Sequence, residues 1–375
     1  MPSFVPSPGM LARSALILLG LAAIGAVLMA WSGFYSVAAS RGHWPGFELF
    51  LDFGMRSSVR THAWGIEVPQ LDDENRVRRG AAHFHLGCAP CHGAPSTPPM
   101  LATRSMLPEP SNLKVLAPIW KPNELFWIVK NGLKYTGMPA WPTQRRDDEV
   151  WDMVAFLLRL PAMTPERYRS LAGLDRVPQQ PLHANRPGEG PDRQRTLVEA
   201  CTRCHGREGR ARDTTAFPRL DLQTEGWLLA QMQAYASGRR PSGVMQTATT
   251  GLTTPDMTWL ARHFASAGGQ PAGAVVPPSD PAGEAIFLRG APEHGVPACV
   301  ACHAADAAAR DRAYPALLGQ HAGHIERQLA LYRDGKRRTT DEAQLMSTIA
   351  GRMTDEQVHA VAAYLSSQPA AVTGR

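Results

Sequence analysis

The pattern of apolar and polar positions along the chain predicts helices throughout and no convincing strand. Residues 15–39 carry no charge over 25 positions. As a helix of about 37 Å, this run could cross a hydrocarbon core of about 30 Å. Apolar side chains recur at helical spacing just beyond it, behind Trp44, and these are Phe47, Phe50, Leu51 and Met55. They predict a second helix, lying either at the membrane interface or on the protein body.

Two stretches rich in proline and glycine interrupt the rest of the chain, at 173–191 and 267–281. Such compositions are typical of connectors. They divide the chain into three segments, which we predict as separate domains with the boundaries 70–172, 192–266 and 282–369.

The second and third segments are repeats of each other. Residues 217–220 (Phe-Pro-Arg-Leu) correspond to 314–317 (Tyr-Pro-Ala-Leu). Each copy continues into a glycine followed by basic residues, at 238–240 and 335–337. The repeat predicts the same fold for both segments.

Each segment ends in a predicted amphipathic helix. In the second and third segments a threonine begins this helix, Thr253 or Thr354, in the manner of an N-cap. The first segment shows a helical stretch at 124–130 and a final helix at 147–160 that opens on three acidic residues. The sequence therefore predicts an all-α protein.

Composition limits the class of protein. Apolar residues make up 44% of the chain, which suits globular domains and is low for a protein with many membrane spans. The formal net charge of +6 favours an acidic redox partner or an anionic membrane surface. No basic run carries interleaved aromatic residues, so nucleic acid is not a predicted partner.

Three copies of the pentapeptide Cys-x-x-Cys-His account for all six cysteines. This pentapeptide is the attachment signal for c-type haem. Two cysteines three residues apart can bind the two vinyl groups of one porphyrin, and the next residue is a histidine that points at the iron. The chain is predicted to hold three covalent haems, at Cys88, Cys91 and His92, at Cys201, Cys204 and His205, and at Cys299, Cys302 and His303.

Other uses of paired cysteines fit less well. A zinc ribbon needs Cys-x-x-Cys pairs in twos, and this chain has three. A thioredoxin-like redox pair needs a βαβ context and has no use for the histidine. Structural disulfides rarely join adjacent turns of one helix.

With these motifs and this order of helices, each segment resembles a class I cytochrome c domain. The second and third segments resemble the two halves of tandem dihaem bacterial cytochromes c. The resemblance implies three such domains in tandem behind one transmembrane helix. Each is expected to run from a helix with the haem motif through a middle helix and a methionine loop to the final helix.

The resemblance also implies that a methionine in that loop completes the coordination of each iron. The corresponding positions are Met138, in Gly-Met-Pro, then Met245 and Met346. Met245 and Met346 each precede the final-helix motif by seven residues, and Met353 falls at an apolar core position. Histidine is the rival distal ligand, and the candidates are His83, His85, His294, His321 and His324.

A further expectation from the family concerns the proximal histidines. The carbonyls of Pro218 and Pro315 are expected to accept the ring N–H of His205 and His303. In the first segment the matching proline stays open among Pro95, Pro98, Pro99 and Pro110.

A haem with a histidine and a methionine ligand has no open position, so it transfers electrons and does little else. The leading hypothesis is a trihaem electron carrier, not an enzyme, in the bacterial inner membrane with its haem domains in the periplasm. The expected donor is a quinol-oxidising complex or a dehydrogenase, and the expected acceptor is a terminal oxidase or another cytochrome.

Three alternatives stay open. The chain could be the haem-bearing subunit of a periplasmic dehydrogenase. It could be a multihaem peroxidase or reductase, which requires one haem without a distal ligand. Finally, the apolar run could be a signal peptide cleaved after Val37-Ala38-Ala39, where the small residues suit a peptidase.

Overall fold

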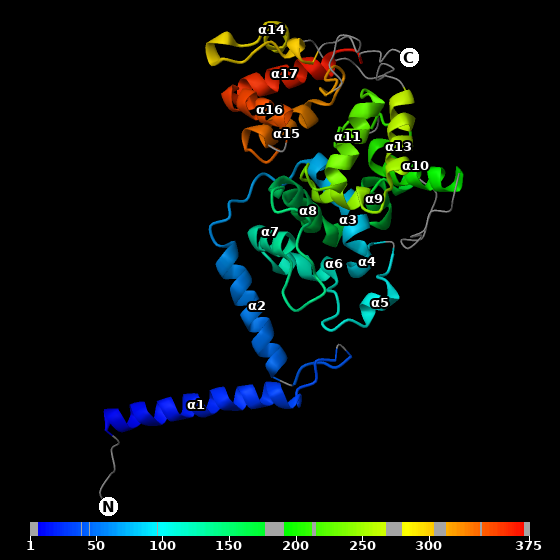
Figure 1. The fold of residues 1–375 in the computed structure, drawn as a ribbon. Helices are drawn as coiled ribbons and strands as arrows, with labels where there is room; N and C mark the ends of the chain where they lie inside the picture. The colour runs from blue at the N-terminus through cyan, green and yellow to red at the C-terminus, as the bar shows by residue number, and fades with distance from the viewer. Residues whose placement is uncertain are drawn as a thin grey trace, which may run out of the picture.

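The computed structural model describes residues 7–38, 40–44, 46–95, 97–176, 191–211, 215–267, 280–303, 313–337 and 340–370. Over these ranges the chain is helical, and extended backbone pairs only in two isolated bridges, Ala94 with Thr97 and Ala291 with Val296. The predicted all-α fold is confirmed. Figure 1 shows one long helix projecting from a body of packed helices.

The projecting helix is α1 (Pro8–Ser32), and none of its residues is buried. It carries an 18-residue window of mean hydropathy 2.3. Compared with the predicted run at 15–39, it begins seven residues earlier (15 − 8 = 7) and ends at Gly33, which adopts φ 66°. This left-handed conformation ends helices at glycine. Ala39 lies outside the described residues.

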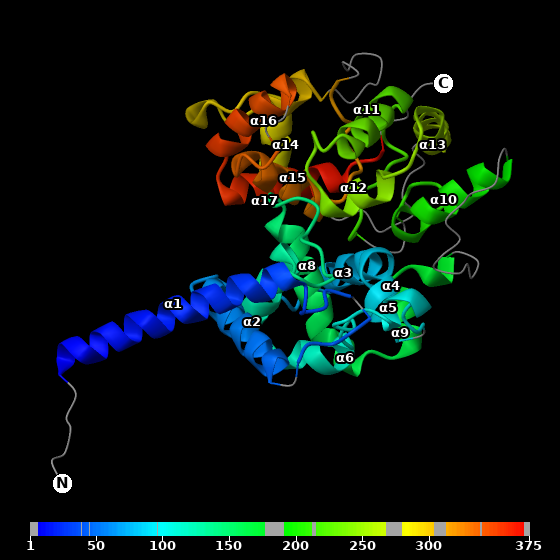
Figure 2. The same cartoon turned by 60° about the horizontal axis from the view of Figure 1, so that its bottom comes forward.

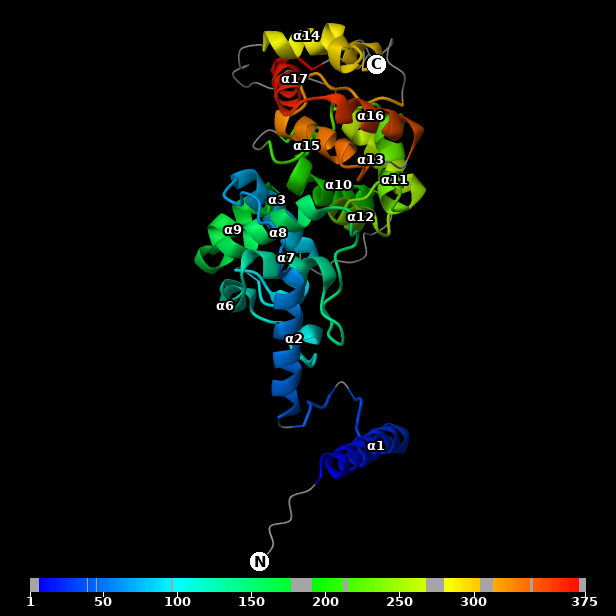
Figure 3. The same cartoon turned by 90° about the vertical axis from the view of Figure 1, so that its left-hand side faces the viewer.

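Helix α2 (Phe47–Ala63) leads from α1 to the body (Figure 3). Its C-terminal half packs on the body, since Val59 and Ala63 are buried and the Asn123 side-chain amide donates to the Ala63 carbonyl at 2.9 Å. Its N-terminal half leaves large apolar side chains exposed, among them Phe50 and Phe53. Packing on the body is therefore confirmed for one half of the helix only.

The body consists of three helical units. The first unit has its own hydrophobic core, with Phe84, Phe156 and Tyr168 fully buried at its centre. The predicted helices at 124–130 and 147–160 are present. The elements of the first unit are α3 (Glu74–Gly87), α4 (Ala89–His92), α5 (Leu101–Arg104), α6 (Leu113–Leu116), η1 (Ala117–Ile119), α7 (Pro122–Asn131), α8 (Asp147–Arg159), η2 (Leu160–Ala162), α9 (Pro165–Leu171) and η3 (Leu174–Arg176).

The second unit is smaller, with a core around Leu260 and Phe264. As predicted, Thr253 caps its last helix, and its hydroxyl accepts the N–H of Asp256 while the Asp256 carboxylate accepts the N–H of Thr253. This reciprocal arrangement is a capping box. The described helices of the second unit are α10 (Pro191–His205), α11 (Glu225–Ala236), α12 (Gly243–Thr249) and α13 (Thr254–Ser266).

The third unit repeats the order of the second. Thr354 caps its last helix in the same way, with Gln357 as the reciprocal partner. Its core includes Phe287, Tyr364 and Leu365. The described elements of the third unit are α14 (Pro281–Arg289), η4 (Pro292–His294), η5 (Cys299–Ala301), α15 (Ala322–Arg333), α16 (Asp341–Arg352) and α17 (Asp355–Ser367).

The three units pack against one another (Figure 2). Between the second and third units the side chains of Gln223 and Gln320 play equivalent parts. Gln223 exchanges two hydrogen bonds with the backbone of Ala316, at 2.9 and 3.0 Å, and Gln320 does the same with Arg219. The predicted connectors at 173–191 and 267–281 lie largely outside the described residues.

Two glycines allow the first and last helices of a unit to touch. A Cβ on Gly80 of α3 would lie 2.2 Å from the carbonyl oxygen of Asp152 in α8. A Cβ on Gly283 of α14 would lie 2.1 Å from the carbonyl oxygen of Ala360 in α17. Backbone cannot move aside cheaply, so both positions require glycine.

We expect Gly283→Ala to lower the free energy of unfolding of the haem-loaded protein by about 1–3 kcal/mol, because the added methyl group overpacks the α14–α17 contact. The matched control is Gly226→Ala in α11, where nothing lies within 4 Å of the new Cβ. The control should be neutral or slightly stabilising, since alanine favours helix. Denaturant unfolding measures both, and equal effects would contradict this explanation.

Candidate functional site: three cysteine–histidine motifs

The first motif lies on a short helical turn, α4, directly after α3. The His92 ring nitrogen Nδ1 is 2.8 Å from the carbonyl oxygen of Ser111. The four prolines considered for this role were therefore the wrong choice, although Ser111 directly follows Pro110. The first segment does not repeat the other two in sequence, so no alignment between segments located Ser111.

The second and third motifs have the predicted partners. His205, the last residue of α10, has Nδ1 3.1 Å from the Pro218 carbonyl oxygen. His303 has Nδ1 3.0 Å from the Pro315 carbonyl oxygen. Both proline predictions are confirmed. The third motif departs from the predicted helix, because it lies on the 3-10 turn η5, separated from α14.

These hydrogen bonds fix how each imidazole is presented. A carbonyl oxygen can only accept, so Nδ1 carries the proton and Nε2 is the nitrogen able to coordinate a metal. Burial lowers the pKa of His92 and His205, while their carbonyl partners oppose the shift. A neutral ring at ordinary pH is the form that ligates iron.

All six cysteines are partly buried, and no disulfide joins them. Burial raises the pKa of Cys88 and Cys201 to about 12 and that of Cys299 to about 11. A thioredoxin-like redox pair needs a lowered thiol pKa, so the burial of Cys88, Cys201 and Cys299 disfavours that alternative.

The three methionines are all half-buried. Met138 lies in the expected loop, where its N–H donates to the Thr136 hydroxyl at 3.1 Å. The other two were also expected in loops, but Met245 lies in the first turn of α12 and Met346 lies within α16. Met353 is 7% exposed in the third core, which confirms its predicted role in packing.

Two of the histidine rivals are held by hydrogen bonds. His85 lies 3.0 Å from the Tyr168 hydroxyl, and His294 lies 3.0 Å from the Gln357 side chain. His83 is 6% exposed, and its ring lies 4.7 Å from that of Trp141. Burial lowers the pKa of His83 to about 4, and similarly that of His321.

The repeated basic residues form a matched pair. Arg240 and Arg337 each lie 4.6 Å over a tyrosine ring, Tyr235 and Tyr332 respectively. Both hydrogen-bond to the side-chain oxygen of Gln328. Burial and the neighbouring Arg337 lower the pKa of Arg240 to about 10. The two guanidinium groups share one acceptor at the boundary between the second and third units, so their positive charges favour an anionic ligand beside them.

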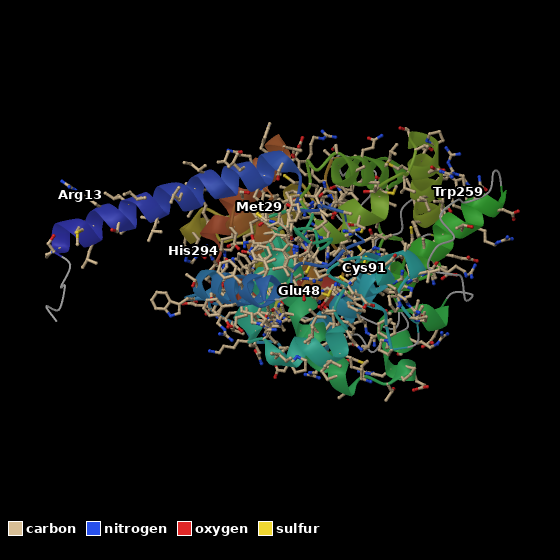
Figure 4. The ribbon with its side chains drawn as sticks, turned by 90° about the horizontal axis from the view of Figure 1, so that it is seen from below. Arg13, Met29, Glu48, Cys91, Trp259 and His294 are labelled. Atoms are coloured by element: carbon tan, nitrogen blue, oxygen red, sulfur yellow. The ribbon has the colours of Figure 1, made fainter. Side chains whose placement is uncertain are left out.

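These features fit covalent haem. Each motif offers two thiols three residues apart and an imidazole oriented by a carbonyl. The guanidinium groups of Arg240 and Arg337 suit the carboxylates of a porphyrin. Figure 4 shows Cys91 within the body, away from Arg13 at the far end of α1. Among the residues that the structure describes, no cluster of three or more His, Cys, Asp or Glu forms another metal site.

Comparison with known proteins agrees with this site. Residues 75–157 match the family model described as cytochrome c oxidase, cbb3-type, subunit III, and residues 282–369 match the model for cytochrome c. The chain is 37% identical over 176 residues to the thiosulfate dehydrogenase electron acceptor of Thiomonas intermedia, covering 46% of this chain and 81% of the relative.

Two further relatives are named cytochrome c4. The protein from Pseudomonas aeruginosa is 32% identical over 166 residues, covering 44% of this chain and 82% of the relative. The solved cytochrome c4 from Acidithiobacillus ferrooxidans is 34% identical, with a TM-score of 0.40, covering 44% of this chain and 97% of that one.

The chain thus belongs to the cytochrome c family. It is an electron-transfer cytochrome with covalently bound haem c, and its relatives include the tandem dihaem cytochromes c4.

Proposed function

We propose that the protein is a membrane-anchored trihaem cytochrome c that relays single electrons on the periplasmic side of the inner membrane. Its three cytochrome c domains are 70–172, 192–266 and 282–369. The observation that carries the proposal is the threefold repetition of one arrangement, in which a backbone carbonyl holds Nδ1 of the histidine that follows two cysteines.

When bound, each haem supplies an iron that changes between the ferrous and ferric forms by one electron. The two cysteines of a motif would hold the porphyrin through thioether bonds, and Nε2 of the histidine would be the proximal ligand. The sulfur of Met138, Met245 or Met346 would be the distal ligand. A soft thioether stabilises ferrous iron and raises the reduction potential.

The packing of the three domains supports a relay within one body. The guanidinium group of Arg203, inside the second motif, is 6% exposed and donates to the carbonyl oxygens of Ala82 and Ala172 in the first unit. In the first unit, Asp152 pairs with Arg79 at 2.5 Å and lies 4.0 Å from Arg327 of the third unit. Buried charges of this kind favour one fixed arrangement of domains.

We propose a quinol-oxidising complex or a dehydrogenase as electron donor, and a terminal oxidase or another cytochrome as acceptor. The printed name of the Thiomonas relative, an electron acceptor of thiosulfate dehydrogenase, favours a dehydrogenase as donor. The second candidate function is a haem-bearing subunit of a periplasmic dehydrogenase. The printed name of the same Thiomonas relative favours it. Co-purification from the native membrane distinguishes a stable subunit from a mobile partner.

The haem count tests the proposal directly. Mass spectrometry of protein made together with the haem-attachment machinery should show three haem additions per chain. Replacing Cys299 and Cys302 by alanine should remove one addition and leave two, because the third motif then has no thiol that can form a thioether bond. Two or fewer haems on the intact sequence, with all three motifs exported, would contradict a trihaem relay.

A further inference from the structure

One buried carboxylate of the first unit reaches into the second. Glu149 lies in the first turn of α8 and is 7% exposed. Arg146 is its ion-pair partner at 2.9 Å, and Arg146 also donates to the carbonyl oxygen of Pro241 in the second unit at 3.1 Å. A capping role within α8 does not explain this cluster, because two partners of the carboxylate, Ser242 and Gly243, belong to the second unit.

The first connection from Glu149 leads to the segment of Met138. Trp141 follows Met138 by three residues, and its indole N–H donates to Oε2 of Glu149 at 3.3 Å. Trp141 is 7% exposed, so this hydrogen bond is shielded from water. The carboxylate therefore holds the loop that carries the proposed distal ligand of the first haem.

The second connection leads to the helix of Met245. The Ser242 hydroxyl donates to Oε1 of Glu149 at 2.6 Å, and the N–H of Gly243 donates to Oε2 at 2.7 Å. The same Ser242 oxygen caps α12 by accepting the N–H of Met245 at 3.0 Å. Only two hydrogen bonds separate the carboxylate from the backbone of the proposed ligand of the second haem.

The two connections also touch each other. A Cβ on Gly243 would lie 2.2 Å from the indole nitrogen of Trp141, so the start of α12 packs directly on this ring. The hydrogen-bond partners of the Glu149 oxygens are all donors, so the carboxylate can accept from each of them. Burial and the neighbouring Asp148 raise the pKa of Glu149, while Arg146 and these donors oppose the shift. A displacement of either ligand segment changes the hydrogen bonds available to the other.

We propose that Glu149 is a positioning residue that couples the first and second haems, because one carboxylate holds both the Met138 loop and the Met245 helix. The inference rests on the proposed assignment of these methionines as ligands. It goes beyond that assignment in giving the first domain control over the distal coordination in the second.

The test follows the methyl resonances of the ligand methionines in the reduced protein, which the haem ring current shifts far upfield. Met138→Leu, Met245→Leu and Met346→Leu assign the three signals. Glu149→Gln should move the Met138 and Met245 signals and leave the Met346 signal in place. The matched control is Glu124→Gln, which removes another first-unit carboxylate that is 7% exposed and accepts a backbone N–H, that of Lys121. This control should leave the Met245 signal unmoved.

A double-mutant cycle tests the coupling itself. Trp141→Phe removes the hydrogen bond of the first connection and keeps an aromatic ring beside Gly243. It should also move the Met245 signal, and the part of this effect that passes through Glu149 should be lost in the Glu149→Gln background. Ser242→Ala should likewise move the Met138 signal, and this effect should also be lost in the Glu149→Gln background. If Glu149→Gln fails to fold, the two single variants still test the coupling, because each should move the methionine signal of the other domain.

The outcomes are distinguishable. If the Met→Leu variants fail to remove their signals, the ligand assignment is wrong and the coupling fails with it. If they remove them but Glu149→Gln leaves the Met245 signal unmoved, the coupling alone is overturned. A uniform shift of all three signals also overturns it, because general loosening of the body explains that result.

Discussion

Replacing α1 by a cleavable export signal should transfer the protein from the membrane to the soluble fraction with its haem content unchanged. α1 is long enough to cross the bilayer at about 1.5 Å per residue. Folding of the body should not depend on α1, because none of the residues of α1 is buried. Fractionation with carbonate extraction and a haem stain on each fraction measure the outcome.

The control replaces α1 by an unrelated apolar helix of the same length, which should keep the protein in the membrane. A mature wild-type protein whose N-terminus is Ser40 would contradict the anchor and favour the cleaved signal peptide. The exposed apolar half of α2 adds to the expected effect. In the anchored protein these side chains follow α1 closely in the sequence, so the membrane interface can cover them. The soluble variant should therefore associate more readily at high concentration.

Local chemistry explains what could be predicted from the sequence. Cys-x-x-Cys-His specifies its own geometry, so the three motifs were recognisable without knowledge of the fold. The resemblance to the cytochrome c family implied the carbonyl partners Pro218 and Pro315, which occupy matching positions in the repeat of the second and third segments. Ser111 was missed because the first segment shares no such repeat. The helical placement of Met245 and Met346 was missed because a family pattern gives the order of elements and not their local backbone.

The arrangement of the units could not be predicted. Arg203 lies between the cysteines of the second motif, yet its hydrogen-bond acceptors are carbonyls of residues in another unit. Glu149 was expected only as an acidic residue at a helix start, which is a local role. In the structure it accepts hydrogen bonds from residues more than ninety positions away. Contacts of this range depend on tertiary packing, which no sequence period encodes.

The coordination of the iron decides between a carrier and an enzyme. The peroxidase or reductase alternative needs one iron with an open position. Each of the three units offers a half-buried methionine at the sequence position that the resemblance implies, in a loop for Met138 and in a helix for Met245 and Met346. The rival histidine His85 is held by Tyr168. In a carrier, carbon monoxide must displace a bound sulfur to reach any of the irons. The reduced carrier is therefore expected to bind almost no carbon monoxide.

Met138→Leu, Met245→Leu and Met346→Leu should each convert the reduced protein from nearly inert to carbon monoxide into one that binds a single equivalent. Leucine keeps the apolar volume but supplies no lone pair, so one iron loses its sixth ligand. The long-wavelength sulfur-to-iron charge-transfer band of the oxidised protein should fall by about a third in each variant, given one such bond per haem.

Met353→Leu is the matched control, because Met353 lies in the same unit as Met346 and packs in the third core. It should leave both the band and the carbon monoxide stoichiometry unchanged. If Met353→Leu removes a band and Met346→Leu does not, the ligand of the third haem is assigned to the wrong methionine. Rapid binding of one equivalent by the wild-type protein would instead reveal one open iron, and an enzyme would then explain that iron better than a relay does.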